Sequence, residues 1–264
     1  LWLLLLTLPI FMWRQHREKR DLQRIIAVFL DDIARHLKLL KIEPDVLHCH
    51  DWHTSLLPVY LHSGLRGSST FSATRSVYTI HNLTYQGVAG AEALALTGMH
   101  SRYWAGDALE HFGWLNPMKG GIIFADQVTT VSPNYAREVQ TPEHGSGLDG
   151  VLRALSYKFS GILNGIDVEE WDPATDPNVE GHFSPDKLSG KAVAKRNLVR
   201  EAGLKYKART PLVGVISRLV EQKGFQLLLP ILGKLLRAGA QAVVLGSGER
   251  YFEDGFRRIE EQYP

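Results

Sequence analysis

The residues with the clearest chemical potential are Arg218 and Lys223, in the stretch SRLVEQKG that ends at Gly224. A guanidinium group can grip phosphate oxygens with two donors, and a lysine ammonium supplies a mobile point charge. An apolar helix is predicted to follow Gly224, so both cations would lie near a helix N-terminus, where free amides also favour anions. The pair therefore predicts a phosphate-binding site, although two solvated surface cations flanking a loop would give the same pattern.

Polar residues follow three other predicted strands. They are His48–Asp51 after the first strand, His81 with Asn82 after the second, and Asn164 with Gly165 after the fourth. In open parallel sheets, ligands bind in the crevice beyond the carboxyl ends of the strands. Any one cluster could be an ordinary turn, but together with Arg218 they predict a crevice lined by hydrogen-bonding groups and suited to a polyhydroxylated ligand.

Two glycine pairs allow close approach of another group. Gly246 and Gly248 lie in LGSGE (245–249), a turn after a predicted strand that would let a nucleotide come near the backbone. A short Gly-x-Gly is weak evidence, because it is more often only a tight turn. Gly120-Gly121 permits either close packing or a ligand contact.

The His-Cys-His run at 48–50 raises the question of a metal. Side chains alternate along a strand, so His48 and His50 are expected to share one face. No second cluster offers further ligands at a recognised spacing, so packing and hydrogen bonding are favoured and no metal is predicted. The spacing also reveals no nucleophile triad and no pair of carboxylates suited to acid–base catalysis.

The elements that must position these residues follow from hydrophobic periodicity and turn signals. Alternating strands and helices predict an α/β protein with parallel sheets, in two series separated by a loop-rich stretch. Ser132 before Pro133 predicts a capped helix start. Strands are predicted at 45–49, 76–80, 127–131, 159–163, 212–217 and 242–245, and helices at 21–42, 54–62, 116–125, 133–139, 187–202, 223–238 and 251–262.

Composition narrows the class of protein further. The chain has 264 residues and a formal net charge of +2. It has no dense basic stripe, which argues against nucleic-acid binding. A single cysteine, Cys49, cannot form an internal disulfide and favours a reducing compartment. The apolar run 1–13 is too short to span a bilayer, and its basic residues follow it rather than precede it. We therefore expect residues 1–19 to be an unassigned fragment edge or a gene-model error, with a buried segment or membrane anchor as the alternative.

An ordered series of stretches carries a family resemblance. The series resembles the glycogen and starch synthases that use ADP-glucose (glycosyltransferase family 5), and it looks closest to the bacterial enzymes, with plant plastid starch synthases next. The stretches are PDVLHCHDWHTSLLPVYL (44–61), YTIHNLTYQG (78–87), KGGIIFADQVTTVSPNYAREVQTPEHGSGLDGVL (119–152), GILNGIDVEEWDPATDP (161–177), GVISRLVEQKGFQLL (214–228) and LGSGE (245–249).

The resemblance implies a GT-B fold, in which two Rossmann-like domains face each other across a cleft. It implies an N-terminal, acceptor-side domain over 20–163 and the start of a C-terminal nucleotide-sugar-binding domain over 164–264. The family's N-terminal Lys-x-Gly-Gly loop and its C-terminal Glu-Pro-Cys-Gly-Leu-type segment have no counterpart among these residues. We therefore expect the chain to be incomplete at both ends.

The resemblance also implies a reaction: glucose passes from ADP-glucose to the non-reducing end of an α-1,4-glucan, with retention and without a metal or other cofactor. Arg218 and Lys223 would hold the donor diphosphate and stabilise the departing ADP. His81 would hydrogen-bond the reacting glucose, as would Asn164.

The resemblance also implies positions in the cleft for four further residues. Gly246 and Gly248 would lie along the adenosine part of the donor, and Asp51 and Asn82 would line the cleft.

The bacterial cytoplasm is the expected location, with a plastid stroma as the alternative. Three other functions are alternatives: a non-catalytic nucleotide-sugar or glucan-binding remnant, a GT-B enzyme that uses a UDP-sugar, and a phosphorylase. The ordered series argues against the UDP-sugar enzyme, and no segment resembles the pyridoxal phosphate site of a phosphorylase.

Overall fold

The computed structural model describes residues 2–4, 36, 37, 39, 40 and 42–264. The chain forms two compact units, Leu1–Gly165 and Ile166–Pro264. The helix predicted at 21–42 and the segment 1–19 fall largely outside the described residues. No helix in the described part of the chain is long and apolar enough to cross a membrane.

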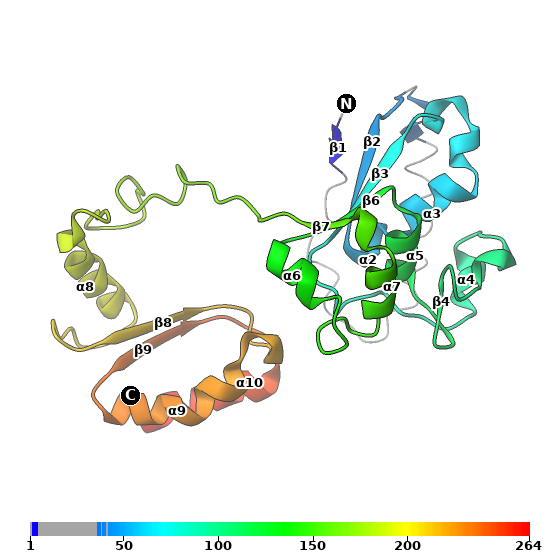
Figure 1. Cartoon of the computed structure of the whole chain (residues 1–264). Helices are drawn as coiled ribbons and strands as arrows, with labels where there is room; N and C mark the ends of the chain where they lie inside the picture. Colours follow the sequence, from blue (N-terminus) through cyan, green and yellow to red (C-terminus); the bar gives the residue numbers. More distant parts are fainter. Residues whose placement is uncertain (1, 5–35, 38, 41) are drawn as a thin grey trace. The chain divides into compact units, whose positions relative to one another are not determined.

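The first unit is built on a parallel sheet of five strands in the order β1-β2-β3-β6-β7 (Figure 1). The strands are β1 (Trp2–Leu4), β2 (Val46–His50), β3 (Arg75–Ile80), β6 (Gln127–Thr130) and β7 (Phe159–Gly161). Four of them fall where apolar and β-branched runs predict strands, and β1 lies in the unassigned segment. Buried residues alternate with less buried ones along β2 and β3, and His48, His50 and Thr79 share the less buried face.

The buried face forms the main core. Cys49, Tyr78, Ile80 and Val128 point from the strands into one buried cluster. The helices of this unit are α2 (Asp51–Thr54), α3 (Leu56–Ser63), α4 (Ala93–Leu96), α5 (Pro117–Phe124), α6 (Pro133–Glu138) and α7 (Asp149–Ala154). Residues of α3, α5 and α7 supply much of the same cluster, so these helices and the sheet share one core.

Close packing explains the glycine pair in α5. A Cβ on Gly120 would lie 2.3 Å from Leu109, and one on Gly121 would lie 2.9 Å from the ring of Tyr78. Of the two interpretations that the sequence left open, close packing is therefore the one the structure supports. Asn116 and Ser132 cap α5 and α6 by accepting hydrogen bonds from backbone N–H groups, and both helices carry proline in the first turn. The predicted start of α6 is confirmed.

Two small features were not predicted. A hairpin of β4 (Glu110–His111) and β5 (Trp114–Leu115) turns through Phe112 and Gly113, both at positive φ. The glycine-rich stretch after Thr141 contains α7, which an ion pair of 2.7 Å between Asp149 and Arg153 supports. Both features are too short to give a clear periodicity.

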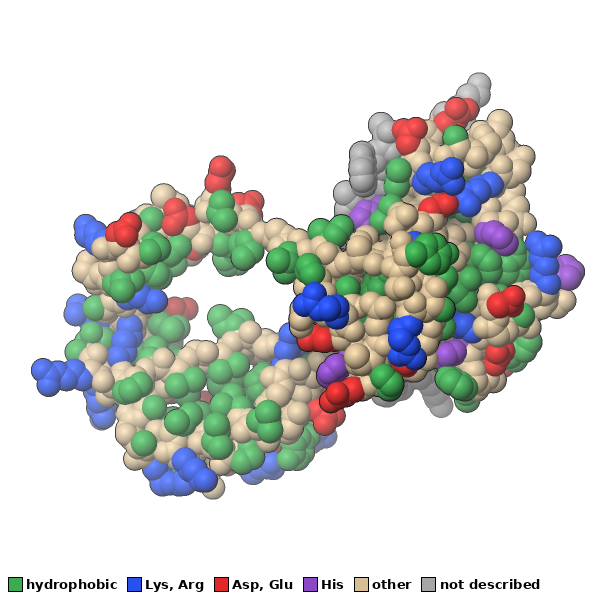
Figure 2. All heavy atoms as spheres, in the orientation of Figure 1, with side chains coloured by type: hydrophobic (Ala, Val, Ile, Leu, Met, Phe, Trp, Pro, Cys, Tyr) green, Lys and Arg blue, Asp and Glu red, His purple; other side chains and the backbone are tan. Residues whose placement is uncertain are grey.

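The second unit contains a parallel pair of strands, β8 (Leu212–Ile216) and β9 (Gln241–Leu245). Its helices are α8 (Lys191–Glu201), α9 (Phe225–Arg237) and α10 (Arg250–Gln262). The buried cluster of this unit consists of Leu219, Phe225 of α9 and Phe252 of α10. Further apolar residues of both helices and of the two strands pack around it. The paired residues Ile216 and Leu245 are 82% and 64% exposed, so apolar side chains reach the surface of this unit, as Figure 2 also shows.

Candidate functional site

The predicted strand-end cluster of the first unit is organised by Asp51. The chain turns directly from β2 into α2 at this residue, which has a left-handed φ of 53°. Its carboxylate Oδ1 accepts hydrogen bonds from the backbone N–H of His81 at 2.8 Å and of Asn82 at 3.3 Å. Aspartate tolerates left-handed backbone better than most residues. Asp51 therefore fixes the loop after β3.

Three histidines lie together on the less buried face beside this loop. The rings of His48 and His50 have centroids 4.2 Å apart, and those of His50 and His81 are 5.3 Å apart. His50 Nδ1 is hydrogen-bonded to His81 Nε2 at 3.1 Å. The prediction that His48 and His50 share a face is confirmed, and the structure adds His81 from the neighbouring strand end.

Threonines extend this cluster across the sheet. His48 Nε2 is hydrogen-bonded to Thr79 Oγ1 at 2.7 Å, and Thr79 Oγ1 to Thr129 Oγ1 at 2.7 Å. The chain of bonds joins β2, β3 and β6 on the less buried face. Sequence reasoning missed both threonines and the contact of His50 with His81. The alternation of polar residues along β3 and β6 is the signal that could have placed them.

Burial favours the neutral form of the two histidines on β2. Burial and the neighbouring His48 and His81 lower the pKa of His50 to about 4, against the opposing effect of Asp51. Burial, with His81 as a second cause, also lowers the pKa of His48. Neutral imidazoles offer one donor and one acceptor each, which suits hydroxyl groups of a sugar.

Cys49 takes no part in this face. It points to the opposite side of β2, is fully buried, and burial raises the pKa of its thiol to about 12. A thiol in that state is neither a good nucleophile nor a metal ligand. Among the described residues, no group of three His, Cys, Asp or Glu side chains is arranged to hold a metal ion.

The two asparagines differ in their surroundings. The side chain of Asn82 accepts a hydrogen bond from the N–H of Thr84 at 3.1 Å and so closes the turn after β3. Asn164 lies beyond the end of β7 and is exposed. No hydrogen bond joins its side chain to another described residue, so its amide is available to a ligand.

In the second unit, Arg218 and Lys223 occupy the loop between β8 and α9. The loop is held by backbone bonds of 3.0 Å from Val220 N–H to Arg218 O and from Lys223 N–H to Val220 O. Gly224, at a φ of 77°, then starts α9 without a side-chain cap. Both cations are exposed, and neither forms an ion pair or hydrogen bond with another described side chain. Two exposed cations before free helix amides are an arrangement that favours an anion, so this loop is a candidate anion site.

The glycines of LGSGE pack against this same loop. Leu219 N–H donates to Ser247 O at 2.9 Å, and Glu249 N–H donates to Leu219 O at 2.7 Å. A Cβ on Gly246 would lie 1.9 Å from Ser217 O, and one on Gly248 would lie 2.3 Å from Leu219 O. The approach of two backbone segments therefore requires glycine at both positions, independently of any ligand.

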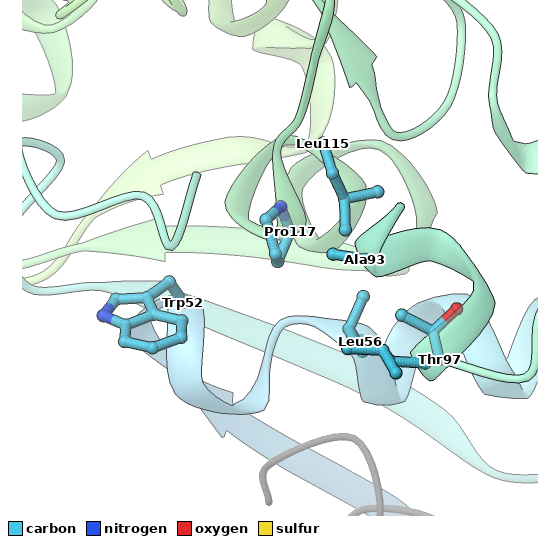
Figure 3. A pocket seen from close by; sticks show the side chains of 7 residues that line it. Trp52, Leu56, Ala93, Thr97, Leu115 and Pro117 are labelled. Carbon is cyan, nitrogen blue, oxygen red and sulfur yellow. The ribbon is translucent and has the colours of Figure 1, made fainter. Parts of the chain in front are cut away.

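A small apolar pocket lies elsewhere in the first unit. Trp52, Leu56, Leu115 and Pro117 point toward one another around it, and Thr97 is its only polar lining residue (Figure 3). The hydroxyl of Thr97 already donates to Leu94 O at 2.7 Å. Sugar sites need several converging polar groups, so this pocket is a packing feature of Trp52.

Comparisons with known proteins agree with this arrangement. A family model described as the starch synthase catalytic domain matches residues 8–154, beginning inside the segment that the sequence left unassigned. A glycogen synthase of Geotalea uraniireducens is 44% identical over 235 residues, which are 89% of this chain and 49% of that protein. A glycogen synthase of Thermotoga maritima is 45% identical over 233 residues, covering 88% and 47%.

A solved structure agrees as well. The catalytic domain of starch synthase IV from Arabidopsis thaliana, bound to ADP and acarbose, superposes with a TM-score of 0.86 at 38% identity. The match covers 96% of this chain and 52% of that one. The chain spans about half the length of the curated relatives it matches. Its α/β architecture is that of the GT-B class, as the resemblance implied. Because the family model covers more than half of its residues, the chain belongs to the starch synthase catalytic-domain family.

Proposed function

We propose that this protein transfers glucose from ADP-glucose to the non-reducing end of an α-1,4-glucan, with retention of anomeric configuration. The observation that carries the proposal is the pair Arg218 and Lys223, exposed and unneutralised at the start of α9 in a chain of this family. When the bond between glucose C1 and the diphosphate breaks, negative charge grows on the departing ADP. Fixed cations stabilise that charge without reorganisation, which lowers the barrier.

The groups of the first unit provide the sugar contacts in this proposal. His81 hydrogen-bonds the reacting glucose, and Asp51 holds the backbone of His81 in place with its 2.8 Å hydrogen bond. Asn164, whose amide has no partner among the described side chains, is a second sugar contact, and Asn82 lines the site. Gly246 and Gly248 keep the loop of Arg218 close to the strand ends, where the adenosine part of the donor would pass.

The chemistry is a group transfer without a redox step. The glucosyl group leaves a diphosphate oxygen and joins the hydroxyl oxygen of the acceptor, whose proton passes to the departing ADP and then to solvent. The cations meet the leaving-group charge, so the proposal requires no metal ion or other cofactor. The bacterial cytoplasm is the proposed location, with a plastid stroma as the alternative.

The test is a transfer assay on the purified chain. ADP-glucose with a labelled sugar is incubated with glycogen or maltoheptaose, and incorporated label is measured beside released ADP. We expect label that β-amylase removes, because that enzyme cuts α-1,4 links from non-reducing ends. UDP-glucose at the same concentration is the donor control and should give much less label.

Each outcome decides a different part of the proposal. Equal or better transfer from UDP-glucose would overturn the choice of donor. Absence of incorporation above the enzyme-free blank would overturn catalysis by this chain, and calorimetric titration with ADP would then test the non-catalytic alternative. Loss of label on Arg218→Ala, with retention on Arg258→Ala, would assign the transfer to the proposed cation pair.

A further inference from the structure

The hydrogen bond between His50 and His81 limits which ring nitrogens of the two histidines can carry a proton. Nδ1 of His50 and Nε2 of His81 are 3.1 Å apart, and a bond between two imidazole nitrogens needs one proton on the line between them. Either His50 donates from Nδ1 or His81 donates from Nε2. The two cases leave His81 with opposite tautomers, and therefore with opposite hydrogen-bonding character at its remaining nitrogen.

The other nitrogen of His50 distinguishes the two cases. His50 Nε2 is buried and has no hydrogen-bond partner among the described residues. If His81 donated, neutral His50 would carry its proton on Nε2, as a buried N–H without an acceptor. If His50 donates, its Nε2 is a bare nitrogen in the same place. Buried backbone N–H groups without a partner are rarer in folded proteins than under-satisfied backbone acceptors, and the same order applied to the ring of His50 favours the second case.

We propose that His50 is a positioning residue, which donates from Nδ1 to Nε2 of His81 and holds His81 as the tautomer with its proton on Nδ1. His81 is exposed, and no hydrogen bond joins its Nδ1 to another described side chain. The pair therefore presents an N–H donor, not an acceptor, to a ligand oxygen. This inference rests on the proposed function, in which His81 donates its Nδ1–H to an oxygen of glucose.

The surroundings of the pair keep this geometry fixed. His81 is held from its backbone by Asp51, and the backbone N–H of His50 donates to Thr54 Oγ1 at 2.6 Å. The charged or titratable groups that act on His50 are His48 and His81, which lower its pKa, and Asp51, which raises it. Since burial is the largest cause and the pKa falls to about 4, His50 stays neutral at neutral pH and can donate only one ring proton.

The tautomer of His81 can be measured without any assay of glucose transfer. The chain is labelled with nitrogen-15 on histidine, and two-bond and three-bond correlations from ring protons identify which nitrogen of each ring is protonated. We expect the Nδ1–H form at His81 and at His50. His81→Gln assigns the resonances by their disappearance.

Two variants of His50 form a matched pair. The amide N–H of asparagine can replace the Nδ1–H donor, so His50→Asn should keep the Nδ1–H form of His81. His50→Phe keeps a ring but offers no donor. A free imidazole in water prefers the Nε2–H form, so His81 should shift toward that form in this variant. The resonances of His111 and His144 report whether either variant is folded.

The outcomes separate this inference from the proposed function. The Nε2–H form at His81 in the unsubstituted chain would overturn the inference, even if His50→Phe does not fold. An unchanged His81 tautomer in folded His50→Phe would overturn it too. In the transfer assay, His50→Phe should lower kcat roughly tenfold, the size typical when an orienting partner is lost, and His50→Asn should restore it. A chain that transfers no glucose would refute the proposed function while the tautomer result still decides the role of His50.

Discussion

The carboxylate of Asp51 accepts a hydrogen bond of 2.8 Å from the backbone N–H of His81, which joins the first residue after β2 to the first residue after β3. The strands are parallel neighbours, so both end at the same edge of the sheet. The left-handed φ of 53° at Asp51 lets the chain enter α2 at once while its side chain reaches the next strand end. Asp51 thus positions the candidate sugar contact without needing to touch the sugar.

This relationship predicts a graded response at Asp51. Asp51→Ala removes the acceptor. It also places an alanine, which has no polar side chain to hydrogen-bond locally, in left-handed backbone. Together these two changes should destabilise the first unit by about 1–2 kcal/mol. Asp51→Gly also removes the acceptor, but glycine adopts left-handed backbone without strain, so this variant should lose less stability than Asp51→Ala. Asp51→Asn keeps an acceptor oxygen and should cost least. Urea unfolding measures the order, and an equal effect of all three would contradict the assigned hydrogen bonds.

A second prediction concerns the two exposed cations. Arg218→Ala and Lys223→Ala should each lower kcat by about 100-fold or more, the size seen when one group that stabilises developing charge is lost. Neither side chain has a partner among the described residues, so the unfolding midpoint should hardly change. Arg258→Ala, an exposed arginine of α10, is the control for general loss of charge. Transfer near the unsubstituted rate in either variant would remove that residue from the proposed site.

Much of the fold could be predicted from the sequence because its elements are short and sharply bounded. Ser132 before Pro133 predicts the start of α6, and the structure confirms that cap. Asn116 caps α5 in the same way before Pro117, a cap that was not predicted. Apolar runs predict β2, β3 and β8 to within a residue or two. The hairpin at Glu110–Leu115 escaped, because its strands are too short for a period and Phe112 adopts an unusual positive φ.

The candidate site could be predicted as a set of residues but not as a geometry. Residue types at strand ends indicate which side chains gather there, whereas the 3.1 Å bond between His50 and His81 depends on the register of two strands 31 residues apart. Buried lysines show the same limit. Lys158 donates to Ile123 O at 2.7 Å and Ala125 O at 2.6 Å, where α5 ends, and no pattern near Lys158 marks that role.

A third prediction separates packing from ligand binding at the glycines of LGSGE. Gly246→Ala would place a Cβ 1.9 Å from Ser217 O, so the loop of Arg218 must move. We expect the second unit to be destabilised by about 1–3 kcal/mol, the usual cost of overpacking, with no ADP present. Gly214→Ala in β8 is the matched control, because its Cβ would meet no atom within 4 Å. A stable Gly246→Ala chain that fails only to bind ADP would instead favour a direct ligand contact.

The last prediction is a loss of stability in mild acid. Burial lowers the pKa of His50 from its ordinary value of 6.5 to about 4 in the folded chain, and burial lowers the pKa of His48 and His111 in the same direction. Between these values the unfolded chain binds more protons than the folded one. Stability therefore rises with pH across this window and is lost as the pH falls from about 6.5 toward about 4.

The carboxylate of Asp126 affects stability in a different, lower pH range. Burial alone would raise the pKa of Asp126, but hydrogen bonds from Ser76, with Arg66 nearby, lower it below its ordinary value of 3.8, so its contribution is lost only at lower pH. Urea midpoints of the first unit, measured at about pH 7, 5.5 and 4.5, should fall with pH, and His50→Phe should reduce the slope. His50 is partly exposed, so the change should be a fraction of the ~1.4 kcal/mol per pKa unit expected for a group shielded from water. His144→Gln, at an exposed position of the same unit, is the control. A slope that His50→Phe leaves as steep as in the unsubstituted chain would mean that His50 takes up its proton in the folded state as readily as in the unfolded one.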